Sequence, residues 1–253
     1  MLDFPVNQFF RRAVIFIFTL GFTASAFSSV TMLGSRIIYP GSAKNVDVQL
    51  KNNDDFPYVI QAWFDEGDIN ARPDSASNIP FVIVPPVFLI KPKAGHIIRV
   101  VQNENKKLPQ DRESVYWFNV LQIPPANVAD GGQQNKMLVT LRTRVKLFYR
   151  PSAISTPKNI FKGLTVKPVW NEQKGMGVEV SNAQPWFASL TQINARVNGQ
   201  QHSLEADMVA PFSQQTYWFS NWKTRQRGQG KVRLMLINDQ GARISESYDV
   251  LFL

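Results

Sequence analysis

Short runs that alternate apolar and polar residues recur along the chain, and turn-forming residues close each run. Examples are "NVDVQLKNND" (45–54), "YVIQAWFDEGD" (58–68) and "SVYWFNVLQIPP" (114–125). A period of two places alternate side chains on opposite faces of a strand, whereas no helical period lasts more than two turns. Residues 81–103 are expected to add two strands around a Pro-Gly corner. About six or seven short strands in roughly 120 residues is the number typical of one immunoglobulin-like sandwich.

A second series of strands follows "PSAISTP" (151–157), whose composition indicates a domain boundary. The strands are expected at 164–171, 177–183, 190–199, 214–220, 231–239 and 242–253. The sequence therefore predicts an all-β protein with two immunoglobulin-like β-sandwich domains, residues 27–151 and 152–253, joined by a short hinge.

Residues 1–26 have the three parts of a secretory signal peptide. Arg11-Arg12 precedes an apolar run from Ala13 to Ala26, which ends in the small residues of "ASA". A membrane anchor is the alternative, but a spanning helix needs about 20 apolar residues, and threonine, serine and glycine dilute this run. We therefore expect cleavage after Ala26, or later near Ser29, and export of the mature chain to the periplasm.

The composition narrows the classes of partner. The chain has no cysteine and a net charge of +9, and loss of Asp3, Arg11 and Arg12 with the signal would leave +8. In an exported protein this charge favours anionic surfaces or carboxylates over nucleic acid. A protein without cysteine has neither disulfides nor thiolate-bound metals.

No catalytic or metal-binding constellation is present in the sequence. The two histidines, His96 and His202, lie in different expected domains, and His96 is expected in a surface turn. There is no G-x-S-x-G, P-loop or G-x-G-x-x-G motif. "DEGD" (65–68) is interpreted as a polar turn in preference to a calcium site. We expect no enzyme activity, no cofactor, no metal and no small-molecule substrate, and we assign most tryptophans to the core or a domain interface.

The segment "KMLVTLRTRVKLFYRP" (136–151) combines an apolar face with a strongly basic one. Apolar residues occupy most odd positions, and lysine or arginine occupies most even positions. Alternation alone would also fit an ordinary strand of the protein's own core. The motifs on either side of the segment are needed to decide whether its apolar face belongs to that core or binds another protein.

"LPQDRESVYWFNVLQIPP" (108–125) followed by "RTRVKLFYRP" (142–151) resembles the signature of the periplasmic pilus chaperones of the chaperone–usher pathway. "SRIIYPG" (35–41), "FPYVIQAW" (56–63) and "PPVFLIKPKAG" (85–95) also match this family. The resemblance is strong over about residues 33–151 and looser over 158–253, where mainly "INDQG" (237–241) matches. It implies two immunoglobulin-like domains set at an angle, and a protein that binds pilus subunits and passes them to an outer-membrane usher.

The resemblance assigns roles to the basic and apolar residues. A pilus subunit lacks its last strand, and the chaperone lends one of its own, which is a form of strand addition. Met137, Val139 and Leu141 would fill the groove of the pilus subunit. Arg36 and Lys146 would anchor the C-terminal carboxylate of the subunit through charge-assisted hydrogen bonds.

Further positions match the family without contacting the subunit. Glu113, Arg150 and Asp239 correspond to an ionic cluster that sets the angle between the domains. Val84-Pro85 falls where the family has a cis proline. The loop from Ala126 to Lys136 and the absence of cysteine resemble the short-loop subclass, which typically serves rod-forming pili with adhesive tips.

The parity of the 136–151 strand creates one conflict. Met137, Val139 and Leu141 have odd residue numbers, whereas Lys146 has an even one. An ideal strand would therefore place Lys146 on the face opposite the three apolar side chains. We therefore expect a bulge or twist between residues 142 and 145 that turns Lys146 toward the groove side.

Two other functions remain as alternatives. An exported structural or adhesive β-sandwich protein would be expected to carry a donor extension, but only about Phe27 to Leu33 precede the "SRIIYPG" strand. A secreted enzyme or sugar-binding module would need a site that the sequence does not show. A chaperone of pilus subunits is the function that these observations favour.

Overall fold

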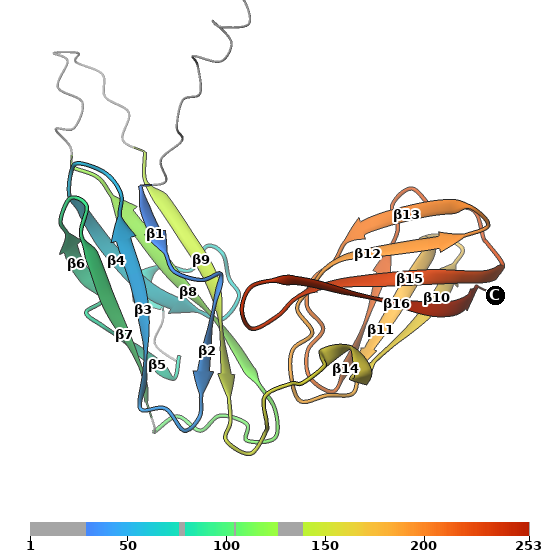
Figure 1. Ribbon diagram of the computed structural model, residues 1–253, viewed down its shortest axis with the longest axis horizontal. Coiled ribbons are helices and arrows are strands. Elements are labelled where there is room, and N and C mark those ends of the chain that lie inside the picture. The colour runs from blue at the N-terminus through green and yellow to red at the C-terminus, as the bar shows by residue number, and fades with distance from the viewer. Residues whose placement is uncertain (1–28, 76–78, 104, 126–138, 253) are drawn as a thin grey trace, which may run out of the picture.

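The computed structural model describes residues 29–75, 79–103, 105–125 and 139–252. The described chain forms two lobes set at an angle, and nearly all its regular structure is strand (Figure 1). The only helical segments among these residues are the short 3-10 turns η1 (Pro73–Ser75) and η2 (Ile160–Gly163). The predicted all-β class with two immunoglobulin-like domains is confirmed. The expected signal peptide, residues 1–26, lies outside the described residues.

The first lobe is a sandwich of two sheets. One sheet has the strand order β1 (Val30–Met32), β3 (Asn45–Asn52), β7 (Gly95–Gln102) and β5 (Phe81–Val84). The other has the order β2 (Arg36–Pro40), β9 (Leu141–Arg150), β8 (Ser114–Ile123), β4 (Tyr58–Asp65) and β6 (Val87–Ile90). Alternate residues of both sheets meet in a core that includes the fully buried Tyr39, Ile60, Ile98, Phe118 and Leu147.

The first two strands belong to different sheets, although only three residues separate them. β1 pairs antiparallel with β3, and the chain then crosses at Gly34, whose φ of +90° suits glycine. β2 continues in the other sheet, where it pairs parallel with β9 from Arg36↔Lys146 to Pro40↔Arg150. This crossing decides which part of β9 has a neighbour on each side.

The second lobe has its own core between two further sheets. The first sheet has the order β10 (Leu164–Asn171), β11 (Gly175–Asn182) and β14 (Ser213–Trp218). The second has the order β13 (Gln200–Glu205), β12 (Leu190–Val197), β15 (Gly228–Ile237) and β16 (Arg243–Phe252). Trp222, Phe219, Ile193 and Leu234 are among its most deeply buried side chains.

Three local expectations need correction. Residues 81–103 form three strands instead of two, because Pro85-Pro86 interrupts the first run. The Val84–Pro85 bond is cis, as the family resemblance implied. The polar strand β13 falls outside the predicted strands, since its side chains are mostly exposed and show little apolar alternation. His96 lies within β7 and not in a turn, and its ring stacks on Phe88 at 3.9 Å between centroids.

The separate cores predict that damage to one lobe stays local. Phe118 is fully buried, with its ring 5.3 Å from that of Phe64, so Phe118→Ala should destabilise the first lobe by about 3–5 kcal/mol. Hydrogen exchange resolved by segment should show faster exchange in β4 and β8 and unchanged protection in β12 and β15. Phe219→Ala should give the reverse pattern. Equal loss of protection in both lobes would contradict this account.

Candidate functional site

One edge of β9 is only half covered. β8 pairs with β9 from Leu141 to Tyr149, but β2 covers the other edge only from Lys146 onward. Within the described part of the chain, residues 141–145 have no strand partner on that side; we call this stretch the open edge. Its backbone groups are available to a further strand.

Odd-numbered side chains from Val139, just before β9, to Leu147 within it pass from solvent into the core. Val139 and Leu141 are 59% and 51% exposed, whereas Leu147 is fully buried. Val145 is partly buried against the first core. Val139 and Leu141 therefore present apolar surface that the protein's own core does not use. Met137 lies outside the described residues.

The expected bulge between residues 142 and 145 is not present. The pairing of β9 with β8 keeps one register from Gln122↔Leu141 to Ser114↔Tyr149, so Leu141 and Lys146 lie on opposite faces of a regular strand. The predicted bulge is therefore wrong, and the absence of a shared face weakens the joint assignment of groove and anchor roles to this strand. The even face of β9 looks toward the second lobe, where the Phe148 ring lies 5.8 Å from that of Phe187.

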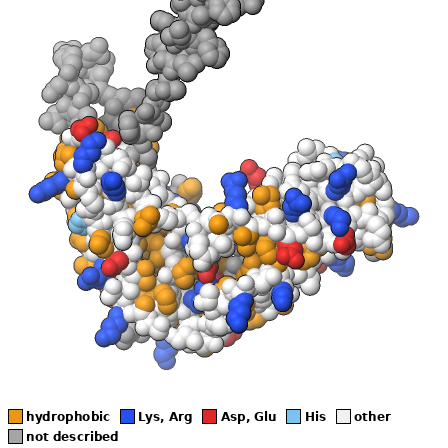
Figure 2. Space-filling model, viewed as in Figure 1, with side chains coloured by type: hydrophobic (Ala, Val, Ile, Leu, Met, Phe, Trp, Pro, Cys, Tyr) orange, Lys and Arg blue, Asp and Glu red, His pale blue; other side chains and the backbone are white. Residues whose placement is uncertain are grey.

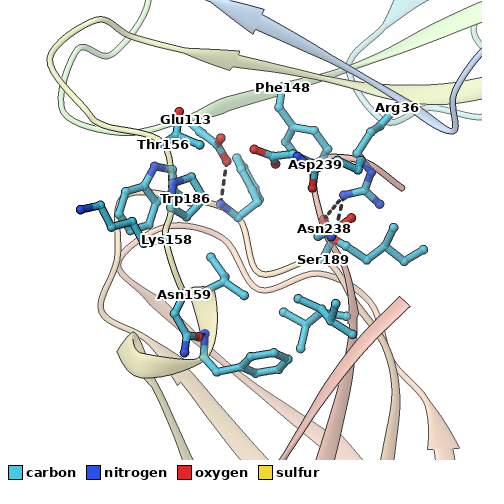
Figure 3. Close-up of a pocket in the computed structure, with 18 of the residues that line it drawn as sticks. Arg36, Glu113, Phe148, Thr156, Lys158, Asn159, Trp186, Ser189, Asn238 and Asp239 are labelled. Atoms are coloured by element: carbon cyan, nitrogen blue, oxygen red, sulfur yellow. Dashed lines mark hydrogen bonds between the residues drawn. The ribbon is translucent and has the colours of Figure 1, made fainter. Parts of the chain in front are cut away.

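Arg36 and Lys146 lie opposite each other across the β2–β9 pair, at the point where the open edge ends. Arg36 reaches from the first lobe to the second, as Figure 3 shows. Its Nη1 donates hydrogen bonds to the Ile237 carbonyl at 2.9 Å and to the Ser189 hydroxyl at 3.3 Å. Its Nε is buried and has no hydrogen-bond partner among the described residues.

Lys146 is half-buried without a compensating contact. Within the described residues, its ammonium group has neither a hydrogen bond nor an ion-pair partner. Burial lowers the pKa of Lys146 below the ordinary lysine value, Asp207 partly opposes that shift, and the nearby charges of Arg36 and Arg144 add to it. Burial also lowers the pKa of Arg36, against the attraction of Asp239 and Glu113. Two cations with incomplete hydrogen bonding form a site suited to a carboxylate.

The structure brings Glu113, Arg150 and Asp239 together between the lobes. Arg150 donates to Glu113 Oε1 from Nε at 2.8 Å and to Asp239 Oδ2 from Nη1 at 2.8 Å. The other oxygen of Glu113 accepts a hydrogen bond from the Phe187 amide at 2.9 Å. Burial raises the pKa of Glu113, and the charge of Arg150 opposes that rise. These bonds connect Glu113, the residue before β8, and β9 of the first lobe with two segments of the second.

A cavity of about 490 Å³ lies where the lobes meet. Its lining includes Arg36, Glu113 and Phe148 from the first lobe and Trp186 and Asp239 from the second (Figure 3). The surface is hollowed between the two lobes in Figure 2. Arg36 therefore lines the cavity between the lobes, whereas its register partner Lys146 is not among the lining residues.

Sequence reasoning missed what the remaining basic residues of β9 do. Arg142 and Arg144 both form ion pairs with Asp65, the first residue of the "DEGD" segment. Asp65 is buried, so this segment is more than a polar turn. The alternation of the sequence could have indicated this contact, because Asp65 occupies a position of β4 that faces away from the core. Arg142 and Arg144 occupy such positions of β9.

The described residues contain no other recognisable site chemistry. No group of three or more histidine, aspartate or glutamate side chains among them could hold a metal ion. No helix among them is long and apolar enough to cross a membrane.

Comparisons with known proteins cover both lobes. Residues 29–155 match the family described as "Pili and flagellar-assembly chaperone, PapD N-terminal domain", and residues 160–248 match "Pili assembly chaperone PapD, C-terminal domain". The probable fimbrial chaperone YadV of Escherichia coli K12 is 34% identical over 241 residues, which cover 94% of this chain and 96% of YadV. Chaperone protein HifB of Haemophilus influenzae is 36% identical, with coverage of 92% and 94%. The crystal structure of the YadV chaperone is similar with a TM-score of 0.72 and 29% identity, over 88% of this chain and all of that one.

The ionic cluster leads to a prediction about the hinge. Arg150→Met would leave the buried Glu113 and Asp239 without their ion-pair partner, and breaking a buried pair costs about 3–5 kcal/mol. We expect a lower free energy of unfolding and a wider range of angles between the lobes. Small-angle X-ray scattering and urea denaturation measure these two effects. Lys231→Met, which removes the exposed pair with Asp249, is the matched control and should change neither.

Proposed function

The chain belongs to the PapD-like family of pilus-assembly chaperones, and we propose that it binds a pilus subunit along the open edge of β9 and at the Arg36–Lys146 pair. The observation that carries this proposal is the place of that pair, at the end of the open edge where β2 begins. A strand added to residues 141–145 would lie in line with β2 and stop in front of the two cations.

The direction of the added strand follows from charge. A strand parallel to β9 would present its C-terminus to Arg36 and Lys146, whereas an antiparallel strand would present an ammonium group or an uncharged peptide. Only a terminal carboxylate satisfies both cations, and it would also fix the register of the pairing. This arrangement does not require Leu141 and Lys146 to share a face, because both faces share the backbone edge that the guest strand joins.

The exposed apolar side chains supply the second part of the interaction. Val139 and Leu141 extend from the same face as the core residues Leu147 and Tyr149, so they would continue that core into a subunit that lacks a strand. Complete burial of each contributes about 1.5–3 kcal/mol. Met137 would be the third such residue. Main-chain hydrogen bonds to the open edge would add to them.

The second lobe would complete the carboxylate site. Ser189 and Ile237 hold the Arg36 guanidinium, so its position depends on the angle between the lobes. We assign Glu113, Arg150 and Asp239 the role of setting that angle. Residues 27–151 and 152–253 would then be two domains that act as one binding unit.

The cellular setting follows from the family. The relatives are fimbrial chaperones, and the chain would work in the periplasm after removal of residues 1–26, delivering subunits to an outer-membrane usher. The short loop 126–136 lies outside the described residues and leaves the rod-forming subclass as an expectation. The chaperone names of relatives matched over at least nine-tenths of their length weigh against a structural or adhesive protein.

Loss of either anchor cation should abolish stable capture of the subunit. Periplasmic co-expression with the fimbrial subunits encoded nearby, followed by co-purification, should give a 1:1 complex with the natural chain. Arg36→Ala or Lys146→Ala should weaken it by about 2–5 kcal/mol, since each leaves a desolvated carboxylate with one partner. Lys167→Ala, in the second lobe, is the control. Undiminished yield of the pilus subunit with folded Arg36→Ala and Lys146→Ala would contradict the anchor role.

Binding should weaken in alkaline solution because of Lys146. Its pKa is lowered in the free protein, and a bound carboxylate would raise it by favouring the charged ammonium. Affinity should therefore be full below the free-state pKa and fall as pH rises through it, toward the ordinary lysine value of about 10.4. Titration calorimetry with a peptide that copies the last residues of a pilus subunit measures this dependence. In Lys146→Met that part of the pH dependence should be absent.

A further inference from the structure

On the face of β9 opposite the apolar residues, two arginines form hydrogen bonds and ion pairs with neighbouring strands. Both carboxylate oxygens of Asp65 accept from Arg144, Oδ2 from Nε at 2.9 Å and Oδ1 from Nη2. Arg142 Nη2 lies 3.6 Å from Oδ2 of the same carboxylate. The two arginines occupy the even positions of the open edge, where β9 has a strand on one side only.

Asn119 closes the network between the two arginines. Its Oδ1 accepts from Arg142 Nε at 3.0 Å and Nη2 at 2.8 Å, and its Nδ2 donates to Asp65 Oδ2 at 2.8 Å. Arg142 Nη1 also donates to the Ile69 carbonyl at 2.5 Å. Asn119 and Asp65 are buried, so the bond between them is protected from water, whereas the bond to Ile69 is exposed.

The guanidinium groups of the two arginines pack on the rings of two tryptophans. The Arg142 guanidinium lies 4.9 Å from the centre of a Trp63 ring, and that of Arg144 lies 4.9 Å from a Trp117 ring. Flat cations over indole faces gain from the ring quadrupole as well as from packing. The network crosses three strands, from β4 through β8 to β9, with Asn119↔Arg144 and Trp63↔Asn119 as register partners.

The contacts of Asp65 favour its ionised form. Burial acts to raise the pKa of this carboxyl, but hydrogen bonds from Arg144, Asn119 and the Gly67 amide outweigh it and leave the pKa below the ordinary value. Asp65 is therefore ionised at neutral pH, and each arginine has a permanent partner.

We propose that Asp65, Asn119, Trp63 and Trp117 hold Arg142 and Arg144 so that the open edge is straight and in register before a subunit arrives. These are positioning residues: they contact the face of β9 opposite the apolar side chains that would enter the subunit. The inference rests on the proposed function, because it concerns the same edge. An edge already ordered loses less conformational entropy on binding than one that must be ordered during capture.

The test uses Asp65→Asn, which preserves the shape and removes the charge, and Asp47→Asn as the matched control. Asp47 pairs with Arg99 at 3.4 Å on the other sheet of the same lobe, and both are exposed. In the free full-length protein, Asp65→Asn should speed hydrogen exchange in residues 139–145 by about tenfold or more, with β3 and β7 unchanged. Asp47→Asn should leave residues 139–145 as in the natural chain.

The functional readout is the rate at which the protein captures a subunit. A purified fimbrial subunit, unfolded in urea and diluted into excess chaperone, should associate about tenfold more slowly with Asp65→Asn than with the natural chain. The double variant Arg142→Gln, Arg144→Gln should behave in the same way and leaves the Asn119 and Gly67 contacts of Asp65 in place. Arg144→Lys, which retains the charge, should recover part of the rate.

Arg36→Ala in the same assay separates the two claims. If the natural chain fails to capture the subunit, or Arg36→Ala captures it equally well, the proposed function is wrong. If Arg36→Ala loses capture while Asp65→Asn and the double variant capture at the natural rate, the positioning inference is overturned. Loss of exchange protection spread evenly over β3, β7 and β9 would also overturn it, because the network would then be a general stabiliser.

Discussion

The parallel pairing of β2 with β9 is the constraint on which the rest of the site depends. It begins at Arg36↔Lys146 and covers only the second half of β9. The same pairing therefore leaves an open edge, defines where that edge ends, and brings two cations together at the end. If β2 continued along the whole of β9, the edge would be closed, and the apolar residues beyond it would serve only this protein.

The two faces and the backbone edge of β9 each make a different kind of contact. The odd-numbered residues Val139 and Leu141 offer apolar surface, and the open edge offers backbone hydrogen-bonding groups. The even-numbered residues contact the protein itself, with the exception of Lys146, which we propose binds a carboxylate. Arg142 and Arg144 share the single carboxylate of Asp65, whereas Lys146 has no ion-pair partner within the described residues. Of the four basic residues of β9, Arg142, Arg144 and Arg150 therefore have ion-pair partners within the protein, and Lys146 has none among the described residues.

Sequence patterns predicted the fold well because strands and turns are local features. Alternation located most strands, and the motifs around residues 108–151 pointed to the family. The pattern did not predict that Pro85-Pro86 separates two strands in 81–103. It also did not predict that the polar β13 pairs with β12, because the sequence of one strand does not specify its pairing partner. The candidate site was harder, since a one-dimensional parity rule suggested a bulge where the sheet is regular. Contacts between distant segments, such as Asp65 with Arg144 or Arg36 with Ile237, required the fold.

The central claim is that Arg36 and Lys146 bind a terminal carboxylate at the end of the open edge. A double-mutant cycle tests it most directly: affinity is measured for the natural chaperone and Arg36→Ala, each with a subunit bearing a free or an amidated C-terminus. The account predicts that amidation weakens binding to the natural chain strongly and has little further effect on Arg36→Ala, which means a coupling of about 2 kcal/mol or more. Equal effects of amidation on both chaperones would contradict it.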